Sequence, residues 1–155
     1  MFYPIAETIL ANMTRGVRLP VEYAAAPIQN TTSGESSVME IITEGLYCYP
    51  DQKYAMFGYF QGAILMPNVL ARFNTSALNS IKSVILVGNP YRIPAKTSKV
   101  VCFAQHDKKA SVGMFAAHAM SSDSAMPELS RELDQSGKVL DYCFGVSMND
   151  IHLGI

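Results

Sequence analysis

The feature that most constrains the fold is a short apolar run without polar alternation, Ser-Val-Ile-Leu-Val at Ser83–Val87, which is followed by Gly-Asn-Pro. A strand that is apolar at every position is typical of a central parallel strand covered by helices on both faces. A second apolar strand is predicted over Lys53–Tyr59, and a helix over Gly62–Phe73 lies between the two. This order predicts two adjacent parallel strands in one sheet, joined by a right-handed crossover.

The rest of the chain continues the alternation of helices and strands. Helices are predicted over Phe2–Met13 and Ser36–Tyr47, strands over Val17–Ala24 and Lys138–Cys143, and a polar loop over Pro27–Ser37. Short strands separated by helices favour an α/β fold, a three-layer sandwich with a mostly parallel sheet. The length of 155 residues suits a single domain over residues 1–155. Residues 94–124 fit neither pattern and are expected to pack over one end of the sheet.

Composition and charge argue against several classes of protein. The 12 Lys and Arg residues against 13 Asp and Glu residues give a net charge of −1, which argues against a nucleic-acid-binding protein. No apolar run approaches the roughly 18–20 residues that a transmembrane helix needs, so no membrane span is expected. The first residues lack the basic start and apolar stretch of a secretory signal peptide.

No cofactor and no metal site are expected from the sequence. The cysteines, Cys48, Cys102 and Cys143, lie far apart and lack the C-x-x-C spacing of zinc and redox sites. Glycine patterns that bind phosphates or dinucleotides are absent. His106-Asp107 and His118 could suggest a metal or acid–base site, but isolated histidines are more often structural or solvated.

The segment that carries chemical information is Phe-Gly-Tyr-Phe-Gln-Gly-Ala at Phe57–Ala63, between a predicted strand and a predicted helix. This is the context of the nucleophile elbow G-x-S-x-G, in which the nucleophile occupies a strained turn. The two glycines are expected to be required sterically, because strand and helix approach closely there. The nucleophile position holds Phe60, whose phenyl ring has no hydroxyl group and cannot attack an ester. We expect strained backbone angles at Phe60, with the ring at the mouth of the site.

The whole chain resembles the cutinase family of α/β-hydrolase esterases, which includes fungal cutinases and acetylxylan esterases. The segment Gly58–Ala63 is similar to the family's G-Y-S-Q-G-A with the serine replaced, and Cys48–Tyr54 is similar to its C-P-D-T-K. Val84–Pro90 resembles the apolar strand that ends in G-D/N-P. Ser136–Cys143 resembles the late strand before the catalytic aspartate, and His152-Leu153 the H-L pair with the catalytic histidine. The resemblance implies a cutinase-like α/β-hydrolase fold.

The resemblance also implies a set of site residues. In the family a serine attacks a carboxylic ester, a histidine takes the proton, an aspartate orients the histidine, and backbone amides hold the oxyanion. Phe60 stands at the nucleophile position, the Gln61 N–H at an oxyanion position, and His152 at the base position. Asp150 is the nearest carboxylate to the orienting position, although the family places its aspartate closer to Cys143.

Substrate, assembly and location follow only from the resemblance. It implies an ester polymer or a lipid-like molecule as substrate, a monomer, and a secreted protein. Asn-x-Ser/Thr sequons at Asn12, Asn30 and Asn74 fit secretion.

The leading hypothesis is a degenerate member of the family with little or no esterase activity. It lacks the family's first strand and terminal helix, and its cysteines lack their family partners. One alternative is an active serine esterase that uses another serine, such as Ser147 or Ser111. The other is a non-catalytic protein that binds a lipid or a wall polymer.

Overall fold

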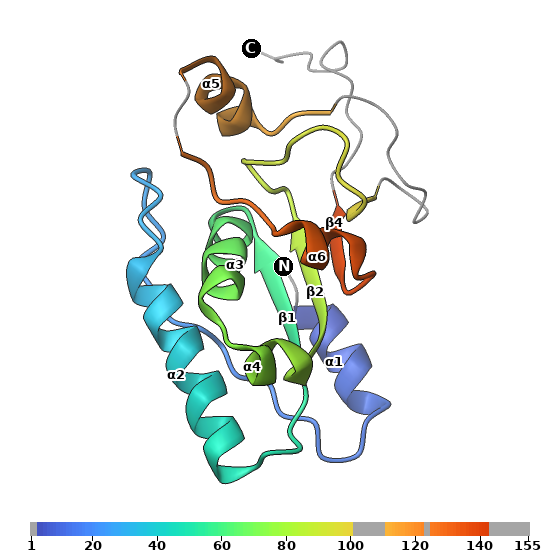
Figure 1. Cartoon of the computed structure of the whole chain (residues 1–155). Helices are drawn as coiled ribbons and strands as arrows, with labels where there is room; N and C mark the ends of the chain where they lie inside the picture. Colours follow the sequence, from blue (N-terminus) through green and yellow to red (C-terminus); the bar gives the residue numbers. More distant parts are fainter. Residues whose placement is uncertain (1–2, 101–110, 123–124, 143–155) are drawn as a thin grey trace.

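A parallel sheet forms the centre of the structure, a computed structural model that describes residues 3–100, 111–122 and 125–142 (Figure 1). Its strands are β1 (Tyr54–Tyr59), β2 (Ile81–Val87), β3 (Lys99–Val100) and β4 (Val139–Tyr142), in the spatial order β1-β2-β4-β3. Every pair of neighbours runs parallel, and Phe57 of β1 lies opposite Ile85 of β2. The predicted adjacency and parallel pairing of the first two strands is confirmed.

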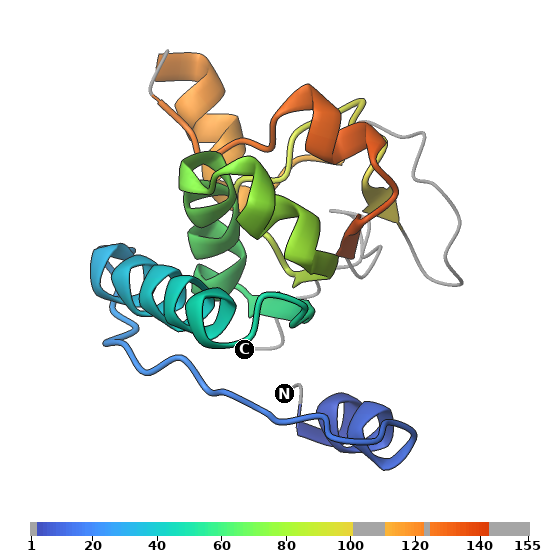
Figure 2. The same ribbon diagram turned by 60° about the horizontal axis from the view of Figure 1, so that its bottom comes forward.

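Helices flank this sheet. They are α1 (Tyr3–Ala11), α2 (Thr32–Cys48), α3 (Gln61–Arg72), α4 (Thr75–Ser80), α5 (Met114–Ser122) and α6 (Arg131–Gln135). The helix α3 packs on β1 and β2, and α2 packs on the outer side of α3. Figure 2 shows α1 on the opposite side of the sheet from α2 and α3. The layers are therefore helix, sheet and helix, as the alternation of elements predicted.

The core lies between α3 and the sheet. Leu65 and Val69 of α3 and Val84 and Leu86 of β2 are each at most 1% exposed. The strand β2 has a neighbouring strand on each side, and its apolar side chains are buried on one face, at Val84 and Leu86, and partly buried on the other, at Ile85 and Val87. The unbroken apolar run therefore identified the central strand correctly.

The strand predicted over Val17–Ala24 is wrong. These residues form an irregular segment, and Val17 and Leu19 are 76% and 52% exposed. Pro20 in the middle of the segment cannot donate a ladder hydrogen bond, and no described strand pairs with the segment. Apolar and β-branched residues favour a strand only where a neighbour supplies a ladder and a packed face.

The loop predicted over Pro27–Ser37 is too long, because α2 already begins at Thr32. Serine and glycine in its first turns weaken the helical signal of the sequence. Gly34 is nevertheless buried, and a Cβ atom there would lie 2.5 Å from a methyl carbon of Leu65. Packing of α2 on α3 therefore decides the start of the helix. The unassigned stretch 94–124 contains β3 and α5 in its described part.

A tight contact joins α2 to the start of β1. The hydroxyl oxygen of Tyr54 lies far inside van der Waals distance of the position that a Cβ atom would take at Gly45. The same hydroxyl is buried and has no hydrogen-bond partner among the described residues, and burial raises its pKa. Glycine at position 45 therefore makes room for a hydroxyl group that contributes nothing favourable.

We predict that the effect of Gly45→Ala depends on the residue at position 54. In the wild type the added methyl group collides with the Tyr54 hydroxyl, so the free energy of unfolding falls. In a Tyr54→Phe background only the ring carbon Cζ remains close, at 3.3 Å, so the loss should be smaller, and the higher helix propensity of alanine offsets it by up to about 1 kcal/mol. Tyr54→Phe alone should be neutral or stabilising, because it removes an unpaired buried hydroxyl. Urea unfolding of the four proteins measures the coupling, and equal effects in both backgrounds would contradict this account.

Candidate active site

The turn between β1 and α3 has the geometry of a nucleophile elbow. Phe60 connects the strand to the helix with φ 48° and ψ −106°. Its N–H donates to the Val87 carbonyl oxygen at 3.0 Å, which ties the ends of β1 and β2 together. A bulky residue with such angles is strained by about 1–3 kcal/mol. The predicted backbone strain at Phe60 is confirmed.

Among the described residues, crowding requires glycine at only one of the two elbow positions. A Cβ atom at Gly58 would lie 2.5 Å from the Gly62 carbonyl oxygen and 2.9 Å from the Ala63 nitrogen. At Gly62 the nearest atom would be the Tyr23 hydroxyl at 3.6 Å, which is an ordinary contact. The expectation that both glycines are sterically necessary is therefore right for Gly58 and wrong for Gly62.

Gln61 begins the helix after the elbow, and its side chain binds the segment 26–30. It begins α3, where the first backbone N–H groups of a helix have no partner within the helix. The side chain is 5% exposed. Its Oε1 accepts from the Ala26 N–H at 3.2 Å, and its Nε2 donates to the Asn30 carbonyl at 3.1 Å. The Gln61 side chain thus holds the segment 26–30 beside the elbow.

Aromatic rings line the carboxyl edge of the sheet next to the elbow. The ring of Phe60 meets the ring of Phe115 edge to face, with centroids 6.3 Å apart and an interplanar angle of 67°. Phe115, on α5, also contacts Tyr91 at 5.8 Å. Tyr91 follows β2, so the three rings come from three different elements. Edge-to-face pairs of this kind stabilise by about 0.5–1.5 kcal/mol beyond the area they bury.

Most of the other predicted site residues lie outside the described part of the chain. Asp150, His152 and Ser147 lie outside the described residues, as do His106 and Asp107. His118 is exposed on α5, and its carbonyl accepts hydrogen bonds from Ser121 and Ser122. Of the predicted catalytic positions, the described part of the chain places Phe60 and Gln61 together.

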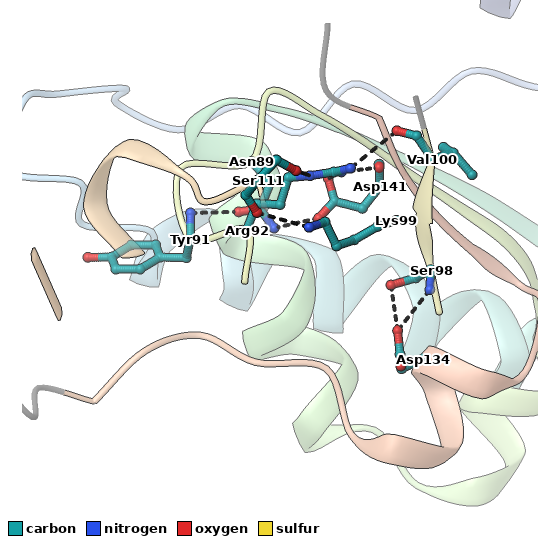
Figure 3. A network of polar contacts seen from close by, with 9 residues as sticks. All are labelled: Asn89, Tyr91, Arg92, Ser98, Lys99, Val100, Ser111, Asp134 and Asp141. Atoms are coloured by element: carbon teal, nitrogen blue, oxygen red, sulfur yellow. Dashed lines mark hydrogen bonds and ion pairs between the residues drawn. The ribbon is translucent and has the colours of Figure 1, made fainter. Parts of the chain in front are cut away.

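A buried polar network joins the loop after β2 to β3 and β4 (Figure 3). Arg92 and Asp141 form an ion pair with 3.0 Å between Nη1 and Oδ1, and both are at most 5% exposed. Asn89 donates to the other carboxylate oxygen at 3.1 Å, and its own Oδ1 accepts from the Tyr91 N–H at 3.0 Å. Lys99 is 1% exposed and donates to the Ser111 carbonyl at 2.9 Å. The network fixes the loop after β2 that carries Tyr91.

Burial disfavours the charged form of Asp141 despite its positively charged neighbours. Burial raises the pKa of Asp141 above its ordinary value, although the Arg92 charge, the Asn89 hydrogen bond and the Lys99 charge oppose the rise. The desolvation of a carboxylate thus outweighs the attraction of its partners. The sequence analysis missed Arg92, Lys99 and Asp141, because charged residues are rarely buried and no local pattern marks them.

The comparisons with known proteins agree with this geometry. A family model described as Cutinase matches residues 5–143. The chain belongs to the cutinase family. Proteins named cutinase from two strains of Hypocrea jecorina are 29% identical over 94 residues, which is 58% of this chain and 37% of theirs. A solved structure described as a novel cutinase-like protein from Cryptococcus sp. has a TM-score of 0.76 and 26% identity, covering 92% of this chain and 66% of that one.

The fold is therefore the cutinase-like α/β-hydrolase fold, as the resemblance implied, and the chain is a homologue of cutinase-family esterases. It spans little more than a third of the length of the Hypocrea jecorina relatives. Cys48 is exposed and forms no disulfide, while Cys102 and Cys143 lie outside the described residues.

The described residues contain neither a membrane-spanning helix nor a cluster of metal-binding side chains. Within residues 3–100, 111–122 and 125–142, no helix is both long and apolar enough to cross a membrane. The same ranges hold no group of three His, Cys, Asp or Glu side chains that could bind a metal ion.

The proposed alternative nucleophile Ser111 has an unfavourable neighbour in this cutinase-family chain. Its hydroxyl oxygen accepts from Arg92 Nε at 3.3 Å. A guanidinium group stays protonated in proteins, so Arg92 cannot take a proton from the serine. Lys99 directs its ammonium group to the Ser111 carbonyl instead. These contacts argue for a structural role of Ser111.

A second carboxylate, Asp134 of α6, anchors the segment before β3. Its oxygens accept from the backbone N–H groups of Thr97 and Ser98 at 3.0 and 2.9 Å and from the Ser98 hydroxyl at 2.7 Å. Burial acts to raise the pKa of Asp134, but the hydrogen bonds from Ser98 and Thr97 and the Lys96 charge outweigh it and lower the pKa. The ionised form is therefore the one that the folded chain stabilises.

We predict that glycine is better than alanine at position 60. Both Phe60→Gly and Phe60→Ala remove the ring, but only glycine adopts a φ of 48° without strain. The glycine variant should be more stable by about 1 kcal/mol. As a control, the same pair at exposed Thr43 inside α2 should show the reverse order, since alanine is the better helix former. Denaturant unfolding measures both pairs, and an alanine variant as stable as the glycine variant would refute the strain.

We predict a pH-dependent effect of Asp134→Asn. The folded pKa is lowered, so the carboxylate stabilises the fold above its unfolded pKa, and this contribution is lost as pH falls through the folded pKa. At pH 7 the variant should lose about 1–3 kcal/mol, because an amide group cannot accept all three hydrogen bonds.

Urea unfolding at a series of pH values measures this difference. The gap between wild type and Asp134→Asn should shrink in acid, whereas exposed Asp51→Asn should stay near the wild type throughout. A gap that is constant with pH would contradict the assignment.

Proposed function

We propose that the chain is a single cutinase-like domain that has lost the nucleophile of its esterase relatives and hydrolyses esters slowly or not at all. The observation that carries the proposal is Phe60 in the strained turn between β1 and α3. In an esterase this turn presents the attacking hydroxyl, and the N–H of the next residue, here Gln61, faces the developing oxyanion. A phenyl ring supplies no hydroxyl group, so no acyl-enzyme can form at this position.

The surroundings of Phe60 support the same conclusion. The ring packs against Phe115 of α5 and so occupies space beside the elbow. Losing the nucleophile of a triad lowers kcat by about six orders of magnitude in a well-studied serine protease. Binding and oxyanion stabilisation alone then remain. His152 at the base position and Asp150 at the orienting position belong to the proposal on the basis of the family resemblance.

The ancestral substrate class proposed here is a carboxylic ester of a polymer such as cutin or acetylated xylan. The relatives that the chain matches are named cutinase or cutinase-like. A monomer secreted from the cell is the corresponding proposal for assembly and location. Sequons at Asn12, Asn30 and Asn74 support secretion, and each of these side chains is exposed.

We predict that the wild type gives no turnover of p-nitrophenyl butyrate and is not labelled by an organophosphonate, because no activated serine is present. Phe60→Ser should accept label at most slowly and remain nearly inactive, since Asp150 stands only two residues before His152 in place of the family's more distant aspartate. Mass spectrometry locates any label, and Ser111→Ala is the matched control for reaction at another serine.

The outcomes separate the competing hypotheses. Label on the wild type that disappears in Ser111→Ala would overturn the proposal in favour of an active serine esterase. Turnover by Phe60→Ser within about tenfold of an intact relative would show that the acid–base residues are functional. Phe60 alone would then account for the lack of activity in the wild type.

A further inference from the structure

The three N-glycosylation sequons of the chain lie in different local structures, although all three asparagines are exposed. Asn12 follows α1, and its Nδ2 already donates to a carbonyl oxygen of that helix at 2.8 Å. Asn74 precedes α4, and its Oδ1 caps the helix by accepting from a backbone N–H at 2.9 Å. Asn30 lies just before α2, and its Oδ1 accepts from the Thr32 N–H at 3.0 Å. The three sites would therefore hold a glycan in different surroundings.

The amide nitrogen of Asn30 is available for the attachment of a glycan. Residues 30–32 read Asn-Thr-Thr, which fits the acceptor pattern Asn-x-Ser/Thr. The Asn30 oxygen binds the backbone of the third sequon residue, in a side-chain turn that asparagine forms readily. Its Nδ2 makes no hydrogen bond to another described residue. A glycan replaces one hydrogen of this nitrogen and leaves the turn intact.

Asn30 lines an open hollow of about 410 Å³ beside the start of α2. The rest of the lining consists of Ala24, Ala26, Ile28, Thr32, Ser33 and Ser36. Ile28 stands two positions before Asn30 and is 80% exposed, so most of its apolar side chain faces water. Among the described residues, no charged side chain lines the hollow. Such a surface favours a neutral occupant that covers Ile28 and forms hydrogen bonds with hydroxyl groups.

The wall of the hollow before α2 is held in place by hydrogen bonds. The Gln61 side chain binds the Ala26 N–H and the Asn30 carbonyl oxygen. Between these two residues, Gln29 takes a φ of 55°, and its Nε2 donates to the Ala26 carbonyl at 3.2 Å. Asn30 therefore holds a glycan at a fixed point of a preformed wall, which lowers the entropic cost of ordering the first sugar.

We propose that a glycan on Asn30 is a structural part of this chain, with its first N-acetylglucosamine ring in the hollow against Ile28. The C–H face of the ring removes the exposed Ile28 side chain from water. The hydroxyl and N-acetyl groups of the ring match the hydroxyls of Thr32, Ser33 and Ser36, which both donate and accept. The covalent bond keeps the ring beside the hollow at a high effective concentration. The inference rests on the proposed secretion, because Asn-linked glycans are attached on the secretory route.

The test compares one sequence with and without the sugar. The chain carries Asn12→Gln and Asn74→Asp, so that the sequon of Asn30 remains, and aspartate preserves the cap of α4. Yeast expression behind a foreign leader peptide, followed by an endoglycosidase that leaves one N-acetylglucosamine, gives the modified form. A bacterial host gives the unmodified form, and both are melted under reducing conditions. The foreign leader separates this test from the proposed secretion, because failure of the chain's own secretion would not change the comparison.

We expect the modified form to melt about 2–4 °C higher than the unmodified form. With Ile28→Ser in both forms the rise should fall to less than half, because the ring no longer covers an apolar side chain. Val17→Ser is the matched control, since Val17 is 76% exposed but does not line the hollow, and the rise should stay unchanged. No rise, an equal rise with Ile28→Ser, or an unoccupied Asn30 in the mass spectrum of the yeast product would overturn the proposal.

Two further measurements locate the sugar and separate packing from a general effect of glycosylation. NMR should show NOEs between the sugar ring and the Ile28 methyl groups. The same sugar at Asn74, in a variant with Asn12→Gln and Thr32→Val, should raise the melting temperature less than half as much, because Asn74 does not line the hollow. Equal stabilisation at both sites, or a sugar at Asn30 without NOEs to Ile28, would refute the packing.

Discussion

The close approach of β1 to α3 at Gly58 is the constraint on which the elbow depends. A side chain at Gly58 would press on the backbone of Gly62 and Ala63, so strand and helix can meet only where one of them has no Cβ atom. The chain must then reverse within a single residue, and Phe60 takes the strained angles that this requires. The same reversal buries Gln61 and aims its amide at the segment before α2.

None of the interactions that hold the elbow uses the side chain of residue 60. The Phe60 N–H binds Val87, its carbonyl oxygen accepts from the first turn of α3, and the close packing belongs to Gly58. Phenylalanine at the serine position of the G-x-S-x-G motif is therefore compatible with the geometry of the elbow. The phenyl ring also gains a contact with Phe115. Interactions of neighbouring residues maintain the strained backbone angles at Phe60, and these interactions do not require a nucleophile at that position.

The sequence predicted the unit formed by β1, α3 and β2 well, because buried central strands and the spacing of the elbow leave strong local signals. It failed where long-range partners decide the outcome. Val17–Ala24 has the composition of a strand but no described ladder partner, and α2 starts early because Gly34 packs on Leu65. At the site, the sequence predicted the position of Gln61 but not the role of its side chain, which depends on residues more than 30 positions away.

The buried charged residues also depend on long-range partners that a sequence pattern does not reveal. Arg92, Lys99 and Asp141 come from a loop and two strands that are remote in sequence, and each is expensive to bury alone. Together they fix the loop after β2, while the N–H groups of Gly113, just before α5, and Phe115, in α5, donate to carbonyl groups of that loop. Removing the Asp141 carboxylate would take away the ion-pair partner of the buried Arg92, which is strongly destabilising in a buried pair. The carboxyl edge of the sheet is therefore held by groups outside the elbow, so the side chain at position 60 does not decide the shape of this edge.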